Sequence, residues 1–205
     1  DGPTHHGAFD ISFLRAIPNL QFLAPADEAE LKKMLHYAAA ATGPVAIRYP
    51  RGASACSLES GQRHPLLQSG KAEVVKEGSQ ISVWALGHTL GTAARAVEEL
   101  DKQGISARLI NPRFIRPFDT ELLADSVRRH LPIVTVEENA LPGGFGSLVA
   151  EHAMELGHTA GILRIGLPDE FVPHGSQEEL RHMLKIDAEG IKERITSWLK
   201  TRHRP

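Results

Sequence analysis

Cysteine is nearly absent from this chain of 205 residues. The single cysteine, Cys56, excludes an internal disulfide and a cysteine-based zinc cluster, and it suits a reducing cytosol. The sequence also lacks any run of about 18 apolar residues, so it predicts no membrane-spanning helix. No signal peptide is recognisable, although a missing N-terminal part would hide one.

An excess of either charge is missing as well. The chain has 23 lysines and arginines against 25 acidic residues, which gives a formal net charge of −2 with histidine neutral. Such a balance creates no basic field for nucleic acid or for an anionic membrane, so neither partner is expected. The hydrophobic content of 41% is that of an ordinary soluble globular protein, and the length allows one or two domains.

Several catalytic and metal-binding motifs are absent too. No His-Glu-x-x-His occurs, and His152 and His158 are six positions apart, which puts them on different helix faces, so we expect no metal site built within this chain. The glycine-rich stretch 143–147 lacks the spacing of a Walker loop or of Gly-x-Gly-x-x-Gly, and it contains no Gly-x-Ser-x-Gly. It could cradle a phosphate at a helix N-terminus, but a tight strand-to-helix turn explains it better.

The first ten residues, in contrast, carry two acids, two histidines and two glycines. Gly2 and Gly7 permit backbone conformations closed to other residues, while His5 and His6 titrate near neutrality and Asp1 could orient a neighbour or accept a substrate hydroxyl. One interpretation is an active-site loop. The alternatives are a solvated loop or adventitious metal binding by adjacent imidazoles. Because the chain opens inside this segment and without an initiator methionine, we expect that residue 1 is not the biological N-terminus.

Hydrophobic periodicity predicts an α/β fold in which helices and strands alternate. The expected helices are 10–15, 27–41, 89–103, 120–130, 147–156, 177–184 and 188–201, and the expected strands are 20–24, 45–47, 72–77, 81–86, 105–110, 133–136 and 161–165. We expect strands 72–77 and 81–86 to form a hairpin. Residues 53–68 have the composition of a linker, and beyond them we predict a second, parallel sheet with helices on both faces.

Arginines and acids follow several of the predicted strands, where open α/β sheets bind their ligands. Arg51 comes after strand 45–47 with Gly52 beside it, which suits a guanidinium fork aimed at phosphate or carboxylate. A surface ion pair is the alternative for both Arg51 and Arg48.

A second group of charged residues lies at two later strand ends. Glu137 and Glu138 end the strand 133–136, and Arg113 and Arg116 lie in a loop after strand 105–110. We expect structural ion pairs between these acids and these arginines.

An ordered set of segments also carries a family resemblance. It comprises Asp-Gly-Pro-Thr-His-His-Gly-Ala-Phe-Asp (1–10), Leu-Arg (14–15), Ile-Pro (17–18), Arg-Tyr-Pro-Arg-Gly (48–52), Val-Thr-Val-Glu-Glu-Asn (134–139) and Ile-Gly-Leu-Pro-Asp (165–169). Together they resemble the 1-deoxy-D-xylulose-5-phosphate synthases, which are transketolase-like enzymes. The match extends over essentially the whole chain. It implies that residues 1–52 are the C-terminal half of a pyrimidine-binding domain, 53–68 a linker, and 69–205 a transketolase C-terminal-like domain.

The resemblance implies a thiamin diphosphate- and Mg²⁺-dependent homodimer in the cytoplasm, or in the plastid of a plant. Its substrates would be pyruvate and D-glyceraldehyde 3-phosphate, and its products carbon dioxide and 1-deoxy-D-xylulose 5-phosphate, a precursor for isoprenoid and thiamine biosynthesis. The family's diphosphate- and magnesium-binding domain and its activating glutamate lie upstream, and nothing here matches the Gly-Asp-Gly…Asn magnesium motif. We therefore expect the main cofactor-binding residues in the remaining N-terminal part of the polypeptide, and we expect this chain alone to be inactive.

The resemblance also assigns roles to individual residues. His5 would be a catalytic histidine that contacts the reacting centre or the acceptor, and Asp1 would hold substrate hydroxyls or that histidine. Arg51 would bind the aldehyde's phosphate. His6 is a weaker candidate because its position varies in the family, and Arg48 and Tyr49 are expected to be structural. Transketolase, a 2-oxo acid dehydrogenase β-subunit and a non-catalytic dimerisation or binding module stay as alternatives.

Overall fold

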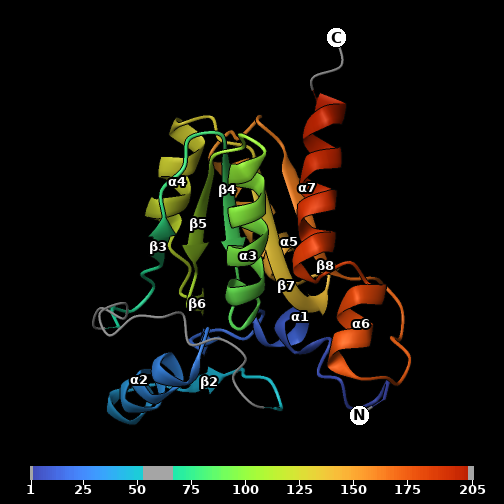
Figure 1. Cartoon of the computed structure of the whole chain (residues 1–205). Helices are drawn as coiled ribbons and strands as arrows, with labels where there is room; N and C mark the ends of the chain where they lie inside the picture. Colours follow the sequence, from blue (N-terminus) through green and yellow to red (C-terminus); the bar gives the residue numbers. More distant parts are fainter. Residues whose placement is uncertain (1, 53–66, 203–205) are drawn as a thin grey trace.

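The computed structural model describes residues 2–52 and 67–202, so most of the predicted linker lies outside the described residues. The larger part of the fold is a five-stranded sheet in the order β3-β5-β4-β7-β8 (Figure 1). Its strands are β3 (Glu73–Lys76), β4 (Ile81–Ala85), β5 (Ala107–Asn111), β7 (Ile133–Ala140) and β8 (Ile162–Leu167). The last four run parallel to one another, and β3 joins the edge in the antiparallel direction.

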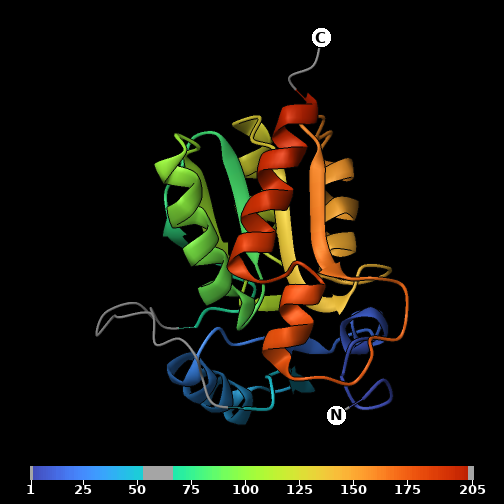
Figure 2. The same cartoon turned by 45° about the vertical axis from the view of Figure 1, so that its right-hand side comes forward.

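Helices cover both faces of this sheet, as the periodicity predicted. Helices α3 (Thr89–Lys102) and α7 (Ala188–Arg202) lie on one face, and α4 (Thr120–Arg128) and α5 (Phe145–Glu155) lie on the other (Figures 1 and 2). Val83 and Trp84 point to opposite faces of β4, because side chains alternate along a strand, and both are fully buried. This two-sided burial explains why the central strands are almost continuously apolar.

The predicted hairpin is wrong. β3 pairs with β5, which lies between β3 and β4. The turn after β3 passes so close to β5 that a Cβ on Gly78 would lie 2.2 Å from the backbone of Ala107. Adjacency in sequence suggested the hairpin, but β4 instead satisfies its backbone groups in parallel pairing with β5 and β7.

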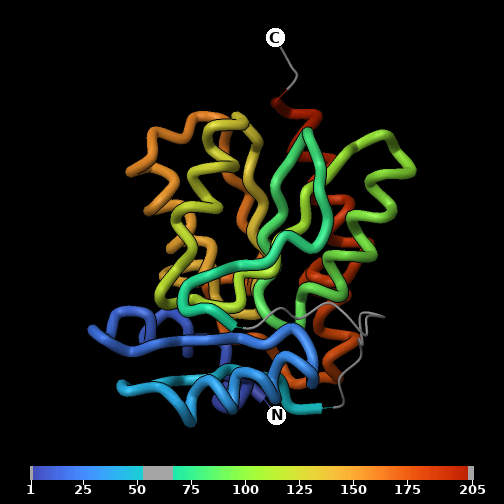
Figure 3. The backbone as a smooth tube through the Cα atoms, turned by 90° about the vertical axis from the view of Figure 1, so that its left-hand side faces the viewer, coloured from blue at the N-terminus to red at the C-terminus, as the bar shows by residue number. Residues whose placement is uncertain are grey.

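The N-terminal residues build a smaller layer below the main sheet (Figures 1 and 3). It contains α1 (Asp10–Leu14), β1 (Gln21–Leu23), α2 (Glu28–Ala40) and β2 (Val45–Ile47), and β1 and β2 are parallel. A third strand, β6 (Phe114–Arg116), pairs antiparallel with β1. The sequence analysis placed β6 in a loop after strand 105–110. Only its pairing with β1 makes it a strand.

A buried ion pair joins the two layers at this point. Glu30 of α2 is completely buried and accepts a hydrogen bond of 2.8 Å from Nε of Arg113. The Arg113 guanidinium also donates to Glu73 of β3 at 2.7 Å. At the start of α2, Asp27 accepts from the Glu30 N–H, and the Glu30 carboxylate accepts from the N–H of Ala26. Arg113 therefore connects the N-terminal layer to the main sheet.

Across the ranges 2–52 and 67–202, none of the helices combines the length and the apolar character that crossing a membrane requires.

Candidate active site

The two layers meet at a cavity of about 330 Å³. It lies at the carboxyl ends of β4 and β7, the edge of a parallel sheet at which α/β proteins bind ligands. Its walls come from the segment 2–9, called here the histidine loop; from residues 48–51 after β2; from the ends of β4, β7 and β8; and from α6 (Gln177–Met183) with the residues on either side of it. The charged and titratable lining residues are His5, His6, Asp10, Arg48, Arg51, His88, Glu138 and Arg181.

The histidine loop is shaped by the glycines that the sequence singled out. Gly2 and Gly7 have φ values of 86° and 65°, in the left-handed region that favours glycine. The N–H of His5 donates to the carbonyl of Gly2 at 3.0 Å, and Nδ1 of His5 lies 2.9 Å from Oγ1 of Thr4. The His5 side chain is exposed at the mouth of the cavity. Asp1, the other predicted catalytic residue, lies outside the described residues.

The other side of the histidine loop faces the segment that leads into α6. Nε2 of His6 lies 3.3 Å from the carbonyl of Pro173, and the rings of Phe9 and Phe171 meet edge to face with centroids 5.8 Å apart. His6 therefore lines the cavity while it contacts a C-terminal segment 167 positions further along the chain. No local sequence pattern signals this contact.

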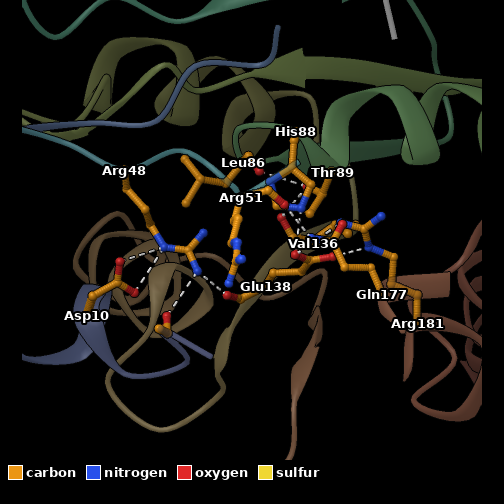
Figure 4. Close-up of polar contacts among 11 residues, drawn as sticks. Asp10, Arg48, Arg51, Leu86, His88, Thr89, Val136, Glu138, Gln177 and Arg181 are labelled. Atoms are coloured by element: carbon orange, nitrogen blue, oxygen red, sulfur yellow. Dashed lines mark hydrogen bonds and ion pairs between the residues drawn. The ribbon is translucent and has the colours of Figure 1, made fainter. Parts of the chain in front are cut away.

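Arg48 fastens the histidine loop to β7 (Figure 4). Its Nε donates to both carboxylate oxygens of Asp10, at 3.0 and 2.8 Å, and its Nη2 donates to the carbonyls of Gly7 and Glu138. The guanidinium is mostly buried, with 16% of the side chain exposed. These are contacts within the chain, and the structural role of Arg48 stays a prediction.

Arg51 extends from the residues after β2 toward the same place. Figure 4 shows its side chain between Arg48 and the group formed by Glu138 and His88. The Arg51 carbonyl accepts a hydrogen bond of 2.6 Å from Nε2 of Gln177, the first residue of α6. The fold thereby brings His5 and Arg51, which are 46 positions apart in the sequence, to the walls of one cavity.

Glu138 is a site residue whose partners the sequence analysis missed. Its carboxylate lies 2.6 Å from Nε2 of His88 and accepts from Nε of Arg181 at 2.5 Å. Burial alone would raise the pKa of Glu138, but the hydrogen bonds and charges of His88 and Arg181 outweigh burial and lower this pKa to about 2. The carboxylate is therefore ionised throughout the physiological range.

The predicted pairing of Glu137 and Glu138 with Arg113 and Arg116 is wrong. Arg113 pairs with Glu30 instead, and Nη1 of Arg116 donates to a backbone carbonyl of the N-terminal layer. Their common position at strand ends suggested the pairing, but the fold gives both the acids and the arginines other partners. The position of Glu138 at a strand end was the one signal that the sequence offered.

Glu137 fills the N-terminus of α5. Its two carboxylate oxygens accept the N–H groups of Phe145 and Gly146, each at 2.7 Å. Burial raises the pKa of Glu137 to about 7, although these two donors act in the opposite direction. Gly144 packs against the same carboxylate, where a Cβ would lie 2.4 Å from Oε2. The glycine-rich stretch is thus a strand-to-helix turn, and Glu137 occupies the N–H groups of Phe145 and Gly146.

The described residues also contain no cluster of three or more histidine, cysteine, aspartate or glutamate side chains placed to hold a metal ion. With the N-terminus of α5 occupied by Glu137, this part of the chain does not fit a diphosphate and its magnesium ion.

Comparison with known proteins agrees with this two-layer arrangement. Residues 70–191 match the family model described as the transketolase C-terminal domain, and residues 1–55 match the transketolase pyrimidine binding domain. A solved structure described as "Split gene transketolase, inactive beta4 tetramer" superposes with a TM-score of 0.88 at 29% sequence identity. The superposition covers 96% of this chain and 63% of that one.

Curated relatives confirm the resemblance to the 1-deoxy-D-xylulose-5-phosphate synthases. A protein of that name from Acidobacterium capsulatum is 46% identical over the whole chain, and one from Thermomicrobium roseum is 45% identical. A 1-deoxy-D-xylulose-5-phosphate synthase 1 from Geobacter sulfurreducens is 43% identical. The chain spans 32% of the length of each of these relatives. By its matches and its fold, the chain belongs to the transketolase family, in which it joins part of a pyrimidine-binding domain to a C-terminal domain.

Proposed function

We propose that this chain is part of a thiamin diphosphate-dependent transferase that condenses pyruvate with D-glyceraldehyde 3-phosphate. The products are 1-deoxy-D-xylulose 5-phosphate, a precursor of the methylerythritol phosphate route to isoprenoids, and carbon dioxide. The observation that carries the proposal is the 46% identity, over all 205 residues, to a protein named as that synthase. The cavity supports it, because a histidine and an arginine suited to a phosphorylated aldehyde line one space.

The residues of the cavity have distinct proposed roles. Arg51 binds the phosphate of the aldehyde, for which a planar guanidinium fork is well suited. His5 contacts the reacting centre or the acceptor, and since Thr4 engages its Nδ1, its Nε2 is the nitrogen that would exchange a proton with substrate. Asp1 holds substrate hydroxyls or His5.

Thiamin diphosphate supplies the carbanion chemistry of such enzymes when it is bound. We assign its diphosphate and Mg²⁺ to residues outside this chain, because Glu137 occupies the N-terminus of α5 and no acidic cluster is available among residues 2–52 and 67–202. The longer polypeptide that would provide them is called the complete protein below. We further propose that it is a cytoplasmic homodimer.

Two observations weigh against the alternative functions. The transketolase neighbour is 29% identical, whereas the synthase relatives are 43–46% identical, which favours the synthase over transketolase itself. That neighbour is described as a tetramer of β chains that is inactive. By analogy, we propose that the isolated chain of residues 1–205 is inactive and that catalysis belongs to a longer polypeptide.

The first test compares this chain with the complete protein. We expect the purified chain of residues 1–205 to form no 1-deoxy-D-xylulose 5-phosphate from pyruvate and glyceraldehyde 3-phosphate, because it cannot orient the cofactor against the substrates. The complete protein, with thiamin diphosphate and Mg²⁺, should form the product, which can be measured by mass spectrometry. Product from the chain alone would refute the expected inactivity, and an inactive complete protein would refute the proposed function.

A second prediction concerns the role of Arg51. In the complete protein, Arg51→Ala should raise the KM for glyceraldehyde 3-phosphate roughly 10- to 100-fold, because a charge-assisted hydrogen bond to phosphate is lost. The KM for pyruvate, which has no phosphate, should change little, and Arg51→Lys should restore binding only in part. Arg128→Ala, at an exposed arginine of α4, is the matched control. An equal increase in KM for a phosphorylated and for an unphosphorylated aldehyde would rule out the phosphate assignment.

A further inference from the structure

We propose that Glu138 is a positioning residue for Arg51 and acts on it through helix α6. The proposal rests on the proposed function, because it deepens the account of the site that would bind the acceptor's phosphate. Glu138 does not itself touch the substrate in this account. It fixes α6, and α6 in turn fixes the backbone from which the Arg51 side chain extends.

The first link is the ion pair between β7 and α6. Nε of Arg181 donates to Oε1 of Glu138 at 2.5 Å, and its Nη2 lies 3.5 Å from Oε2 (Figure 4). Glu138 and Arg181 are 21% and 26% exposed in their side chains, so water screens this pair less than the exposed pairs on the helix surfaces. A partly buried, two-pronged contact of this kind specifies one orientation of the arginine and of the helix that carries it.

The second link runs from α6 to Arg51. Gln177 lies four positions before Arg181, so both side chains leave the same face of α6. Nε2 of Gln177 donates to the Arg51 carbonyl at 2.6 Å. The following residue, Gly52, has a φ of 135°, a conformation that other residues rarely adopt. The hydrogen bond from Gln177 therefore holds the peptide group that joins Arg51 to Gly52.

α6 depends on these polar contacts for its position. None of its residues is buried, and its N-terminus is satisfied internally by a capping box between Ser176 and Glu179. The flanking residues Val172 and Ile186 are 6% and 4% exposed, so the segment is anchored in the core only on either side of the helix. Figure 2 shows α6 below α7, beside the N-terminal segment. Loss of the Glu138 contact should thus shift the helix without unfolding the core.

Glu138 itself is held in place from two sides. His88 contacts its Oε2 at 2.6 Å, and Oγ1 of Thr89 donates to the carbonyls of Leu86 and Val136, which joins the ends of β4 and β7. The Glu138 carbonyl accepts from Arg48, the residue that fastens the histidine loop. One residue therefore connects both walls of the cavity: the histidine loop through its main chain and Arg51 through its side chain.

The experiment measures the KM values and kcat of the complete protein for two single variants, their double variant and a control. Glu138→Gln keeps the shape of the side chain but removes the charge that holds Arg181, and Gln177→Ala removes the second link alone. Both should raise the KM for glyceraldehyde 3-phosphate roughly tenfold, the effect of losing a strong hydrogen bond. The KM for pyruvate and kcat should stay within about twofold. The KM of the double variant for glyceraldehyde 3-phosphate should not exceed that of the more affected single variant.

Glu77→Gln is the matched control, because Glu77 also contacts two arginines, at 3.3 and 3.5 Å, at the opposite end of the sheet.

Binding of inorganic phosphate, measured by calorimetry, gives a readout that does not require turnover. It should weaken roughly tenfold in Glu138→Gln and Gln177→Ala and stay unchanged in Glu77→Gln. If the wild-type complete protein forms no product but phosphate binding follows this pattern, the proposed function fails and the positioning role stands. Three results would overturn the positioning role. They are equal increases in the KM values for glyceraldehyde 3-phosphate and pyruvate, strictly additive effects of Glu138→Gln and Gln177→Ala, and unchanged phosphate binding in these variants.

Discussion

Replacing Arg113 with methionine should lower the free energy of unfolding by about 3–5 kcal/mol, the usual cost of leaving one member of a buried ion pair without its partner. Glu30 is 0% exposed and Arg113 is 2% exposed, so water cannot solvate the remaining carboxylate. Asn111, also completely buried, donates to both oxygens of Glu30 at 3.1 and 3.2 Å, but an amide does not neutralise the charge. Urea denaturation followed by circular dichroism measures the loss.

Two variants control this result. Lys32→Met removes an exposed partner of Glu28 on the same helix, where both side chains are 69% exposed, and should lower the stability far less than Arg113→Met, because water and salt screen an exposed pair. Replacing Glu30 and Arg113 together by methionine should recover part of the stability, because an apolar pair can take the place of a buried ion pair. If Arg113→Met cost no more than Lys32→Met, the pair would not be what holds α2 against the main sheet.

In the complete protein, His5→Ala should lower kcat for synthase turnover by roughly 10²-fold or more, the scale typical of a general acid–base group. The melting temperature should barely change, because His5 is an exposed loop residue whose ring contacts Thr4 and carries no core packing. Steady-state kinetics and a thermal melt of the same preparation separate the two effects.

His36→Ala is the matched control, since His36 is an exposed histidine on α2 that does not line the cavity. His6→Ala tests the weaker candidate and should have the smaller effect of the two loop histidines. Unchanged turnover in His5→Ala, or a collapse of the fold, would assign His5 a structural role in place of a catalytic one.

The order and type of most elements could be predicted, because they depend on local periodicity. In α3, the apolar residues Ala93, Val97 and Leu100 recur at helical spacing and all become buried. In β4, four of the five residues are apolar, which indicated a strand, and Val83 and Trp84 are buried on its two faces. Pairing between distant segments has no such local signature, which is why the position of β3 was predicted wrongly and β6 was missed.

The residue types at the candidate site could also be read in advance, but their partners could not. His5 stood out because its loop is rich in histidine and glycine. Arg48 and Arg51 stood out because they follow strand 45–47. The group of Glu138, His88 and Arg181 comes from three elements, at positions 50 and 43 residues apart. Charged residues are common along the chain, so no spacing distinguishes this group from solvated surface charges.

By itself, the sequence determined the alternation of helices and strands, the absence of a cysteine framework, and the identity of the residues at the strand ends, because each follows from side-chain chemistry or from a period of a few residues. The tertiary structure decided which strands pair, that Arg113 and Glu30 are buried together, and that Glu137 fills the N-terminus of α5. It also placed the histidine loop, Arg51 and α6 around one cavity. Those outcomes depend on which distant segments exclude water from one another, and that exclusion exists only when the whole chain is packed.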